Sequence, residues 1–354
     1  MKVSLALPLL ISLCADTGSG APGFLNYIAE WGYVYAGSIL PSAVNEDGQF
    51  QVSKLEVGDI WYFPKGEAHT VQGLEDENEF LLVFDDGNFD AVGTTFNLDD
   101  WIAHTPVSFL AKNFNLSESV FGNVPSPNPY IQNGTLSPQD QDVTGGNGPL
   151  TGNASYVYYA KDHPLEKVPG RGGTLRIVDT TTFPIATTIA ATVVTLEPGG
   201  LRELHWHPNA AEWLYFHKGQ ARAGVFIGNS NARTFDFSAG DTALFPDNSG
   251  EHTFPSRAYA FFAETVEVME SVFPSPWRNE QLTVFSFLFL GNYIENVSPA
   301  EELVWIETYK SDRVKDISLT QWLALTPANI VADILRIPLD VAKSIKKEKQ
   351  ILIK

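Results

Sequence analysis

The chain has 354 residues, of which 44% are hydrophobic and 18% charged, the balance of a globular protein long enough for two domains. Its 23 Lys and Arg residues against 42 Asp and Glu residues give a formal net charge of −19, which excludes broad electrostatic binding to nucleic acid or to an anionic membrane surface. A single Cys excludes a disulfide framework and a thiolate zinc site within one chain.

The first residues have the layout of a secretory signal peptide. Lys2 precedes an apolar run over residues 3–13, and small residues follow between Ala15 and Ala21. We therefore expect residues 1–20 to be a signal peptide and the protein to be secreted; a buried strand at the start of a domain is the alternative. Four sequons are compatible with a secreted glycoprotein, at Asn115, Asn133, Asn153 and Asn296. No later apolar run is long enough to span a membrane.

The sequence repeats itself at the scale of a domain. Two short segments recur at an offset of 182 residues, Ala29-Glu30-Trp31 as Ala211-Glu212-Trp213 and Gly58-Asp59 as Gly240-Asp241. A third segment recurs at an offset of 221, Leu98-x-x-Trp101 as Leu319-x-x-Trp322. The second copy therefore carries about 39 additional residues between Pro246 and Leu319.

Both copies are rich in short runs of β-branched and aromatic residues separated by Gly, Asn, Asp and Pro, which predicts an all-β sandwich or barrel. The expected strands include residues 61–63, 80–84, 187–196, 223–227 and 303–306, and each copy ends in an expected helix, over 99–114 and 319–335. Residues 122–155 are loaded with Gly, Pro, Asn, Ser and Gln and are typical of a linker. We therefore expect a first domain over 21–121 and a second over 156–354.

The strongest chemical signal lies in the second copy, in the pattern Gly199-x5-His205-x-His207-x4-Glu212-x6-Gly219. Alternation along a strand puts His205 and His207 on one face. Two neutral imidazoles and a carboxylate suit a divalent first-row metal, and no thiolate biases the site toward zinc. A lone His-x-His pair is common by chance, but the full spacing is much rarer, so we predict a metal site here.

This spacing resembles the first conserved motif of the cupin superfamily, and the first copy holds the second cupin motif as Gly58-x5-Pro64-x-Gly66-x2-His69. Together with residues 201–207 and 82–89, these motifs resemble the fungal and bacterial bicupin oxalate decarboxylases, from about Ile28 to the C-terminus. The resemblance implies two cupin barrels (double-stranded β-helix, or jelly-roll) with short C-terminal helices. It also implies manganese as the cofactor and dioxygen as a partner in converting oxalate to formate and carbon dioxide.

The first copy departs from the family pattern. The positions 182 residues before His205, His207 and Arg202 hold Gly23, Leu25 and Gly20. Only two of the usual three His and one Glu ligands remain, Glu30 and His69. The sequence before them is also too short for the strands that precede the His pair in the second copy. We therefore expect manganese only in the second copy.

The sequence leaves the fourth ligand of the second copy open. The family's His is due at position 251, which is Glu251, and His252 comes one place late. Skipping residues 251–291 restores the register but puts Asn292 where the His belongs. His252 and Asn292 are both candidates, and the skipped segment is either a genuine insertion or translated non-coding sequence.

The resemblance implies catalytic roles for Arg202 and Glu307. Arg202 matches the Arg that holds an oxalate carboxylate, although a surface cation at a strand end is the alternative, and Glu307 matches a carboxylate beside the second metal. The family's decarboxylases carry a proton-transfer Glu on a lid in the first domain. Residues 89–96 contain no Glu, and Asp90 is the nearest carboxylate.

Two hypotheses of different class follow. The first is a secreted manganese enzyme of the oxalate decarboxylase type, with an oxidase-type outcome as a variant because the lid Glu is missing. The second is a bicupin that has lost catalysis and serves as a binding or storage protein; a cupin isomerase or dioxygenase is a third alternative. Bicupins of this type resemble each other in packing subunits through a helical C-terminal arm, so residues 319–335 would serve a homo-oligomer. Residues 343–354, with five Lys and one Glu, are expected to be a solvated end.

Overall fold

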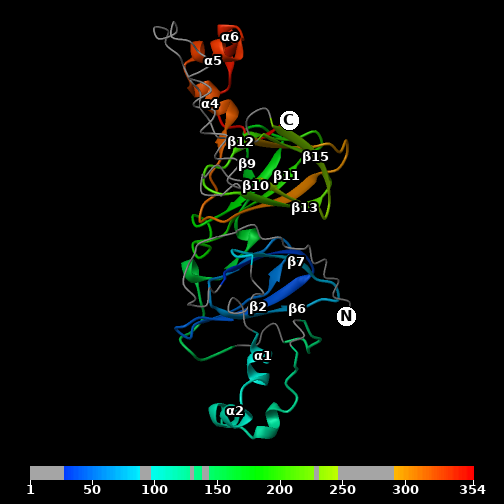
Figure 1. The fold of residues 1–354 in the computed structure, drawn as a ribbon, viewed down its shortest axis with the longest axis vertical. Helices are drawn as coiled ribbons and strands as arrows, with labels where there is room; N and C mark the ends of the chain where they lie inside the picture. The colour runs from blue at the N-terminus through cyan, green and yellow to red at the C-terminus, as the bar shows by residue number, and fades with distance from the viewer. Residues whose placement is uncertain (1–27, 88–96, 128–130, 138–142, 227–230, 246–290) are drawn as a thin grey trace, which may run out of the picture. The chain divides into compact units, whose positions relative to one another are not determined.

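The computed structural model describes residues 28–87, 97–127, 131–137, 143–226, 231–245 and 291–354. The chain divides into two compact units, the first made of residues 1–164 and 179–189 and the second of residues 165–178 and 190–354 (Figure 1). The domain boundary expected at residue 156 thus falls inside the first unit. Leu150, from the segment expected to be a linker, is buried in the core of that unit.

The first unit is built from two antiparallel sheets whose facing sides share one core. Val34, Trp61 and Phe63 from one sheet pack with Ile39 and Leu55 from the other. The sheet in the order β7-β1-β5-β8 contains β1 (Glu30–Ala36), β5 (Ile60–Phe63), β7 (Glu79–Phe84) and β8 (Val157–Tyr158). The other sheet joins β2 (Ser38–Val44) to β3 (Phe50–Val52), β4 (Leu55–Glu56) and β6 (Ala68–Gly73).

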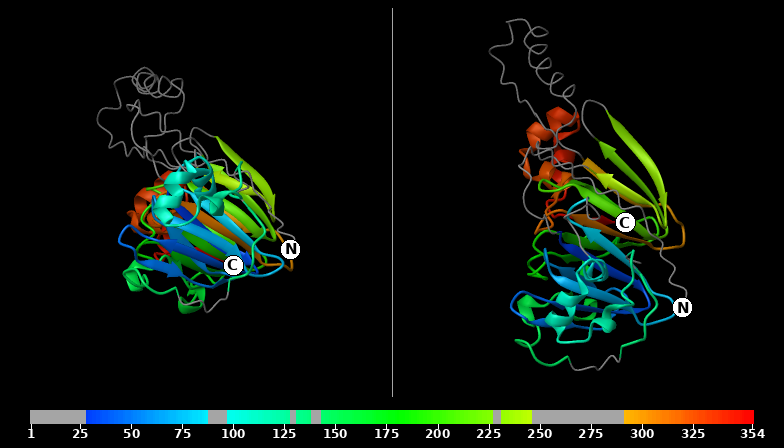
Figure 2. Two further views of the ribbon diagram at one scale, coloured as in Figure 1. Left: turned by 90° about the horizontal axis from the view of Figure 1, so that it is seen from below. Right: turned by 60° about the horizontal axis from the view of Figure 1, so that its bottom comes forward.

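The second unit repeats this two-sheet plan with more strands (Figures 1 and 2). One sheet has the order β16-β13-β18-β11-β10-β9 and contains β9 (Glu166–Lys167), β10 (Gly173–Val178), β11 (Ala190–Leu196), β13 (Glu212–Lys218), β16 (Thr242–Phe245) and β18 (Leu303–Tyr309). The other has the order β15-β14-β17-β12-β19, with β20 also on β12, and contains β12 (Leu201–Trp206), β14 (Gln220–Phe226), β15 (Ala232–Ser238), β17 (Gly291–Asn296), β19 (Ile317–Ser318) and β20 (Leu352–Ile353).

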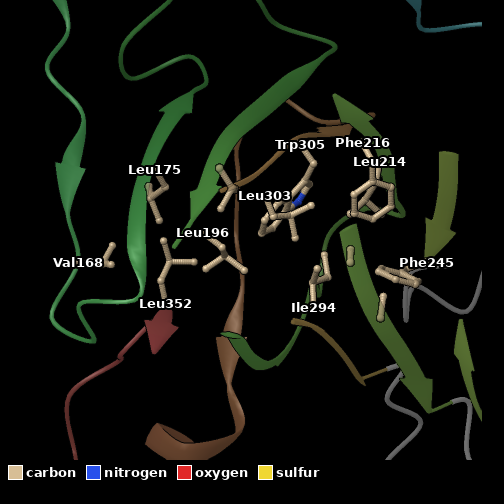
Figure 3. Close-up of a cluster of buried hydrophobic side chains, with 13 residues drawn as sticks. Val168, Leu175, Leu196, Leu214, Phe216, Phe245, Ile294, Leu303, Trp305 and Leu352 are labelled. Atoms are coloured by element: carbon tan, nitrogen blue, oxygen red, sulfur yellow. The ribbon is translucent and has the colours of Figure 1, made fainter. Parts of the chain in front are cut away.

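The core of the second unit lies between these two sheets. Leu196, Leu214 and Trp305 of the first sheet meet Ile294 of the second, with Phe216 beside them (Figure 3). Burial of such large apolar side chains contributes about 1.5–3 kcal/mol each to folding. The all-β prediction is confirmed.

The two units place their repeated residues at matching positions. Glu30 pairs with Phe63 on β5 and Phe84 on β7, and Glu212 pairs with Phe245 on β16 and Tyr309 on β18. The units differ before these strands. β10, β11 and β12 precede β13 in the second unit, whereas no strand precedes β1 among the residues described in the first.

The helices are shorter than expected, because a proline interrupts each one. The segment expected as one helix over 99–114 forms α1 (Leu98–Ala103) and α2 (Val107–Phe114), and the segment over 319–335 forms α4 (Leu319–Leu325) and α5 (Ala328–Leu335). Pro106 and Pro327 precede α2 and α5, and the residue before a proline is disfavoured in helical conformation. α6 (Leu339–Ser344) and the single-turn helices η1 (Glu118–Phe121), η2 (Gly152–Ala154) and η3 (Ala160–Asp162) complete the helices described. None of the described helices has the length and apolar character needed to cross a membrane.

The end of the chain is only partly the solvated end that its lysines led us to expect, because residues 343, 344, 346–348 and 354 are exposed but residues 350–353 are buried or half-buried. Leu352 has 0% of its surface exposed and belongs to the core of the second unit, and β20 pairs with β12. The Lys residues mislead because the apolar run Ile351-Leu352-Ile353 follows Lys349, and the last two residues of that run form β20.

Candidate metal centre

Strand β12 carries Arg202 and His205 into the interior together. They lie three residues apart, so a regular strand would point them to opposite faces. The pairing with β17 shifts between them, since Arg202 lies opposite Ile294 but His205 lies opposite Asn292. This irregularity absorbs one residue, as a β-bulge does, and both side chains are buried. Strict alternation could not have placed Arg202 beside the His pair.

Hydrogen bonds fix the tautomers of both imidazoles. The Nδ1 atom of His205 lies 2.7 Å from the carbonyl oxygen of Glu203, and Nδ1 of His207 lies 2.8 Å from that of Lys315. A carbonyl oxygen only accepts, so each Nδ1 carries the proton and each Nε2 presents a lone pair. The two Nε2 atoms lie 3.1 Å apart. Two facing acceptors are favourable only when a cation or a shared proton lies between them.

Two oxygen donors complete the cluster. Glu212 Oε2 lies 3.4 Å from His207 Nε2 and accepts a 2.9 Å hydrogen bond from Asn292 Nδ2. Glu212 Oε1 and Asn292 Oδ1 are buried without a hydrogen-bond partner among the described residues. A buried acceptor left unpaired costs about 1–3 kcal/mol, which a bound cation would offset. The residues present therefore fit a divalent first-row metal ion held by two imidazole nitrogens and one or two oxygens.

The protonation states match this use. Burial lowers the pKa of His207 to about 4 and that of His205 well below its ordinary value, and the charge of Arg202 adds to both effects. Both imidazoles are therefore neutral at pH 7, as metal ligands must be. Burial raises the pKa of Glu212 well above its usual range, and the charge of Glu307 adds to this. A cation would relieve that penalty. His205, His207 and Glu212 form the one group of three or more His, Cys, Asp or Glu side chains in the described part of the chain whose ligand atoms all lie within 4.8 Å.

Strand β18 brings a second carboxylate beside the cluster. Glu307 is fully buried; its Oε1 accepts a 3.0 Å hydrogen bond from Trp305 Nε1 and its Oε2 a 2.6 Å bond from the Tyr309 hydroxyl. Burial raises the pKa of Glu307, against the opposing charge of Arg202. Tyr309 also reaches His207, its hydroxyl lying 3.4 Å from Nε2. The β18 residues Trp305, Glu307 and Tyr309 occupy every second position, so alternation along the strand places their side chains on one face.

Arg202 is an interior residue and not a surface cation. Its Nη2 donates a 2.8 Å hydrogen bond to Asp316 Oδ2, and its Nε lies 3.8 Å from Glu307 Oε1. Its Nη1 is buried without a partner among the described residues. Burial opposes the charge on Arg202, but Asp316 and Glu307 outweigh it and raise the pKa of the guanidinium. Arg202 therefore presents one uncommitted donor inside the unit.

The first unit keeps a reduced version of the cluster. Glu30 Oε2 lies 3.4 Å from His69 Nε2, and Glu30 Oε1 accepts a 2.9 Å bond from Trp61 Nε1. The register position of Glu307 is taken here by Leu82, which lies opposite Gly32 as Glu307 lies opposite Leu214. The structure thus brings Glu30 and His69 together, but with two candidate ligands only.

Two sequence-based candidates lie outside the described residues, namely His252 and the lid segment 89–96 with Asp90. Sequence reasoning also missed several contributors to the site. The alternation Trp305-x-Glu307-x-Tyr309 could have revealed two of them. Asp316 and Lys349 gave no signal, because they come from a loop and from the end of the chain and meet only in the folded protein.

The sequence matches the family described as Cupin over residues 10–120 and 160–254. With two β-sandwich units and a buried His-x-His and Glu cluster, the chain belongs to the cupin family. More specifically, it belongs to the bicupin oxalate decarboxylase family. It is 52% identical over 326 residues to a probable oxalate decarboxylase of Arthroderma benhamiae, spanning 92% of this chain and 70% of that protein. It is 37% identical over 328 residues to the oxalate decarboxylase of Bacillus subtilis, spanning 92% and 73%.

A solved structure of the Bacillus subtilis oxalate decarboxylase at pH 4.6 has the same fold. It superposes with a TM-score of 0.75 at 34% identity, over 93% of this chain and 76% of that one. The resemblance predicted from the motifs is thereby confirmed at the level of family and fold.

Proposed function

We propose that this protein is a manganese-dependent enzyme of the oxalate decarboxylase type, with its site in the second unit, converting oxalate to formate and carbon dioxide. The observation that carries the proposal is the buried convergence of His205 Nε2, His207 Nε2 and Glu212 Oε2 next to an uncommitted Arg202 donor. Manganese is supported by this donor set and by work on a solved structure of the Bacillus subtilis enzyme that concerns its Mn(II) centres.

The residues divide the work between binding and proton handling. His205, His207, Glu212 and Asn292 would hold the ion, and Arg202 Nη1 would donate to a carboxylate of the oxalate dianion. A manganese ion, with dioxygen as partner, would supply the electron withdrawal that weakens the C–C bond of oxalate. Glu307 is the carboxyl group placed to hold and release a proton, because its pKa is raised and its two oxygens are fixed by Trp305 and Tyr309.

A second candidate function is suggested by the first unit. With Glu30 and His69 as its candidate ligands and no Glu in residues 89–96, the chain also fits a bicupin that binds metal without efficient turnover. The missing Glu also favours an oxidase-type outcome over decarboxylation.

One experiment separates these alternatives. Manganese-loaded protein is incubated with oxalate in air, and formate, carbon dioxide and hydrogen peroxide are each quantified. Formate with carbon dioxide supports the decarboxylase, and peroxide with carbon dioxide supports the oxidase. Manganese retained without any product would overturn both and leave the binding protein.

We also propose that the protein is secreted, on the basis of the charged and apolar start of the chain. Asn115, Asn133 and Asn153 are exposed and available for glycosylation, whereas Asn296 is buried and donates to Leu196 O and Glu301 O. Amino-terminal sequencing and glycan mapping of protein recovered from the culture medium test this. An uncleaved start would contradict the proposed signal peptide, and a glycan on Asn296 would contradict the burial of that side chain.

We propose further that the protein forms a homo-oligomer through the arm made of α4, α5 and α6. The arm leaves apolar side chains exposed, among them Leu325 at 66%. Leu325→Asp should lower the molar mass measured by light scattering. An unchanged mass, or a monomeric parent, would contradict the proposal.

A further inference from the structure

The end of the chain lies along the strand that carries the site. Residues 349–353, here called the tail segment, include β20, which pairs Ile353 with Leu201 and Leu352 with Arg202. Leu352 and Gln350 are buried. The residue opposite Leu352 is therefore the arginine assigned to substrate binding.

The first contact of the tail segment is made by a lysine. Lys349 Nζ donates to the carbonyl oxygen of Asp316 at 3.1 Å and also to its Oδ1. The other carboxylate oxygen of Asp316 accepts from Arg202 Nη2 at 2.8 Å. The preceding residue, Lys315, accepts the Nδ1 proton of His207 through its carbonyl oxygen. Lys349 thus holds the short segment 315–316 that orients both Arg202 and His207.

The second contact of the tail segment reaches His205. The Ile351 N–H donates to Glu203 Oε1 at 2.9 Å, and the Glu203 N–H donates to the Ile351 carbonyl at 2.9 Å. Glu203 in turn accepts the Nδ1 proton of His205 through its own carbonyl oxygen. Ile351 has a φ of +61°, which a β-branched residue adopts only where its surroundings hold it.

The charges of this network favour a dianion. Asp316 lies between two cations, Arg202 and Lys349. Without the positive charge of Lys349, only Arg202 would balance the negative charge of Asp316. The attraction between Arg202 and a bound anion would then be weaker. Burial raises the pKa of Asp316, but the charges of Arg202 and Lys349 outweigh burial and hold that pKa well below its usual value, so Asp316 is ionised.

We propose that Lys349 and Ile351 are positioning residues of the metal and substrate site, through which the tail segment orients Arg202, His207 and His205. The substrate part of this inference rests on the proposed function, since it assumes an oxalate-like dianion. The orienting part does not.

The orienting part is tested without substrate or metal. Amide hydrogen exchange of residues 311–318 is compared among the parent, Lys349→Met, Lys349→Arg and Lys354→Met. Lys354 is the matched control, because it directly follows the tail segment but pairs with Glu197 at the surface. We expect exchange about tenfold faster in Lys349→Met only, because losing an ion pair and a hydrogen bond worth about 1.4 kcal/mol opens the segment tenfold more often. Equal exchange in Lys349→Met and Lys354→Met would overturn the proposal.

The substrate part is tested on manganese-loaded protein by oxalate calorimetry and steady-state kinetics. Lys349→Met should raise the oxalate Kd and KM about tenfold while kcat changes less than about twofold, and Lys349→Arg should restore the Kd and KM. In an Asp316→Asn background, Lys349→Met should have no further effect. Loss of kcat with the oxalate Kd and KM unchanged would overturn the substrate part. If the parent binds manganese but not oxalate, the proposed function fails, and the exchange measurement alone decides the inference.

Discussion

Asn292 occupies in the second unit the register position that His69 occupies in the first. His69 lies opposite Ala43 on β2, and Asn292 lies opposite Val225 on β14, the residue 182 positions further along the chain. Each contacts the glutamate of its own unit, His69 Nε2 at 3.4 Å from Glu30 Oε2 and Asn292 Nδ2 at 2.9 Å from Glu212 Oε2. The insertion before β17 therefore returns the chain in register, with an amide in place of an imidazole.

Because an amide stands where the first unit has an imidazole, we predict that Asn292→His strengthens metal binding in the second unit. An imidazole is a better ligand than an amide oxygen for a first-row divalent ion, so manganese affinity should rise by about tenfold or more. Titration against a competing chelator measures it. His69→Ala is the control and should leave the affinity unchanged. A weaker affinity in Asn292→His would mean that the amide is not in the coordination sphere.

The number of metal ions should follow the number of ligands. We expect at most about one manganese per chain by elemental analysis, because His205, His207 and Glu212 converge whereas Glu30 and His69 stand as a pair. His207→Ala should remove the ion, since loss of one of three ligands leaves too little coordination. Glu30→Ala should leave the content unchanged. Two manganese ions per chain would contradict this count.

The sequence predicted the two β-units and the His205, His207 and Glu212 cluster, because short-range patterns carry both. Alternation aligned the His pair, and the repeat identified Glu212 as the equivalent of Glu30 in the second unit. The position of Arg202 depended on a register shift in β12 that alternation does not contain. The substrate-side network depended on Asp316 and Lys349, whose contact joins a loop to the end of the chain.

The helix boundaries were also not predicted from the sequence composition. Propensity predicted one helix where the structure has two, because Pro106 and Pro327 end the helix despite helix-forming residues on both sides. The tail was predicted to be solvated from its lysines, yet Leu352 between them completes the core. In both cases a single residue outweighed the composition around it.

The first unit should show a pH dependence that arises from Glu67. Burial, and then the charge and hydrogen bond of Glu46, raise the pKa of Glu67 to about 7. A carboxyl whose folded pKa is raised contributes stability that is present below its unfolded value of 4.5 and lost as the pH rises through about 7. Glu67→Gln mimics the protonated group. It should therefore match the parent near pH 4.5 and become the more stable protein above pH 7.

Calorimetric melting of the parent and Glu67→Gln at several pH values measures this difference. Because only the difference is used, the titration of other groups cancels. Glu75→Gln, at another carboxylate of the same unit that accepts a hydrogen bond from Ser38, is the control. A constant difference between parent and Glu67→Gln from pH 5 to pH 8 would contradict the assignment.

The Tyr309 hydroxyl should contribute measurably to the stability of the second unit. It donates a 2.6 Å hydrogen bond to Glu307 Oε2, and both groups are buried. Tyr309→Phe leaves that oxygen without its donor, so metal-free protein should lose about 2 kcal/mol in urea unfolding. Tyr293→Phe is the matched control, because its hydroxyl lies 3.5 Å from Thr234 Oγ1 at the surface, and it should change the free energy of unfolding by less than about 0.5 kcal/mol. Equal losses in the two variants would show that the Glu307 bond adds nothing beyond an ordinary surface hydroxyl.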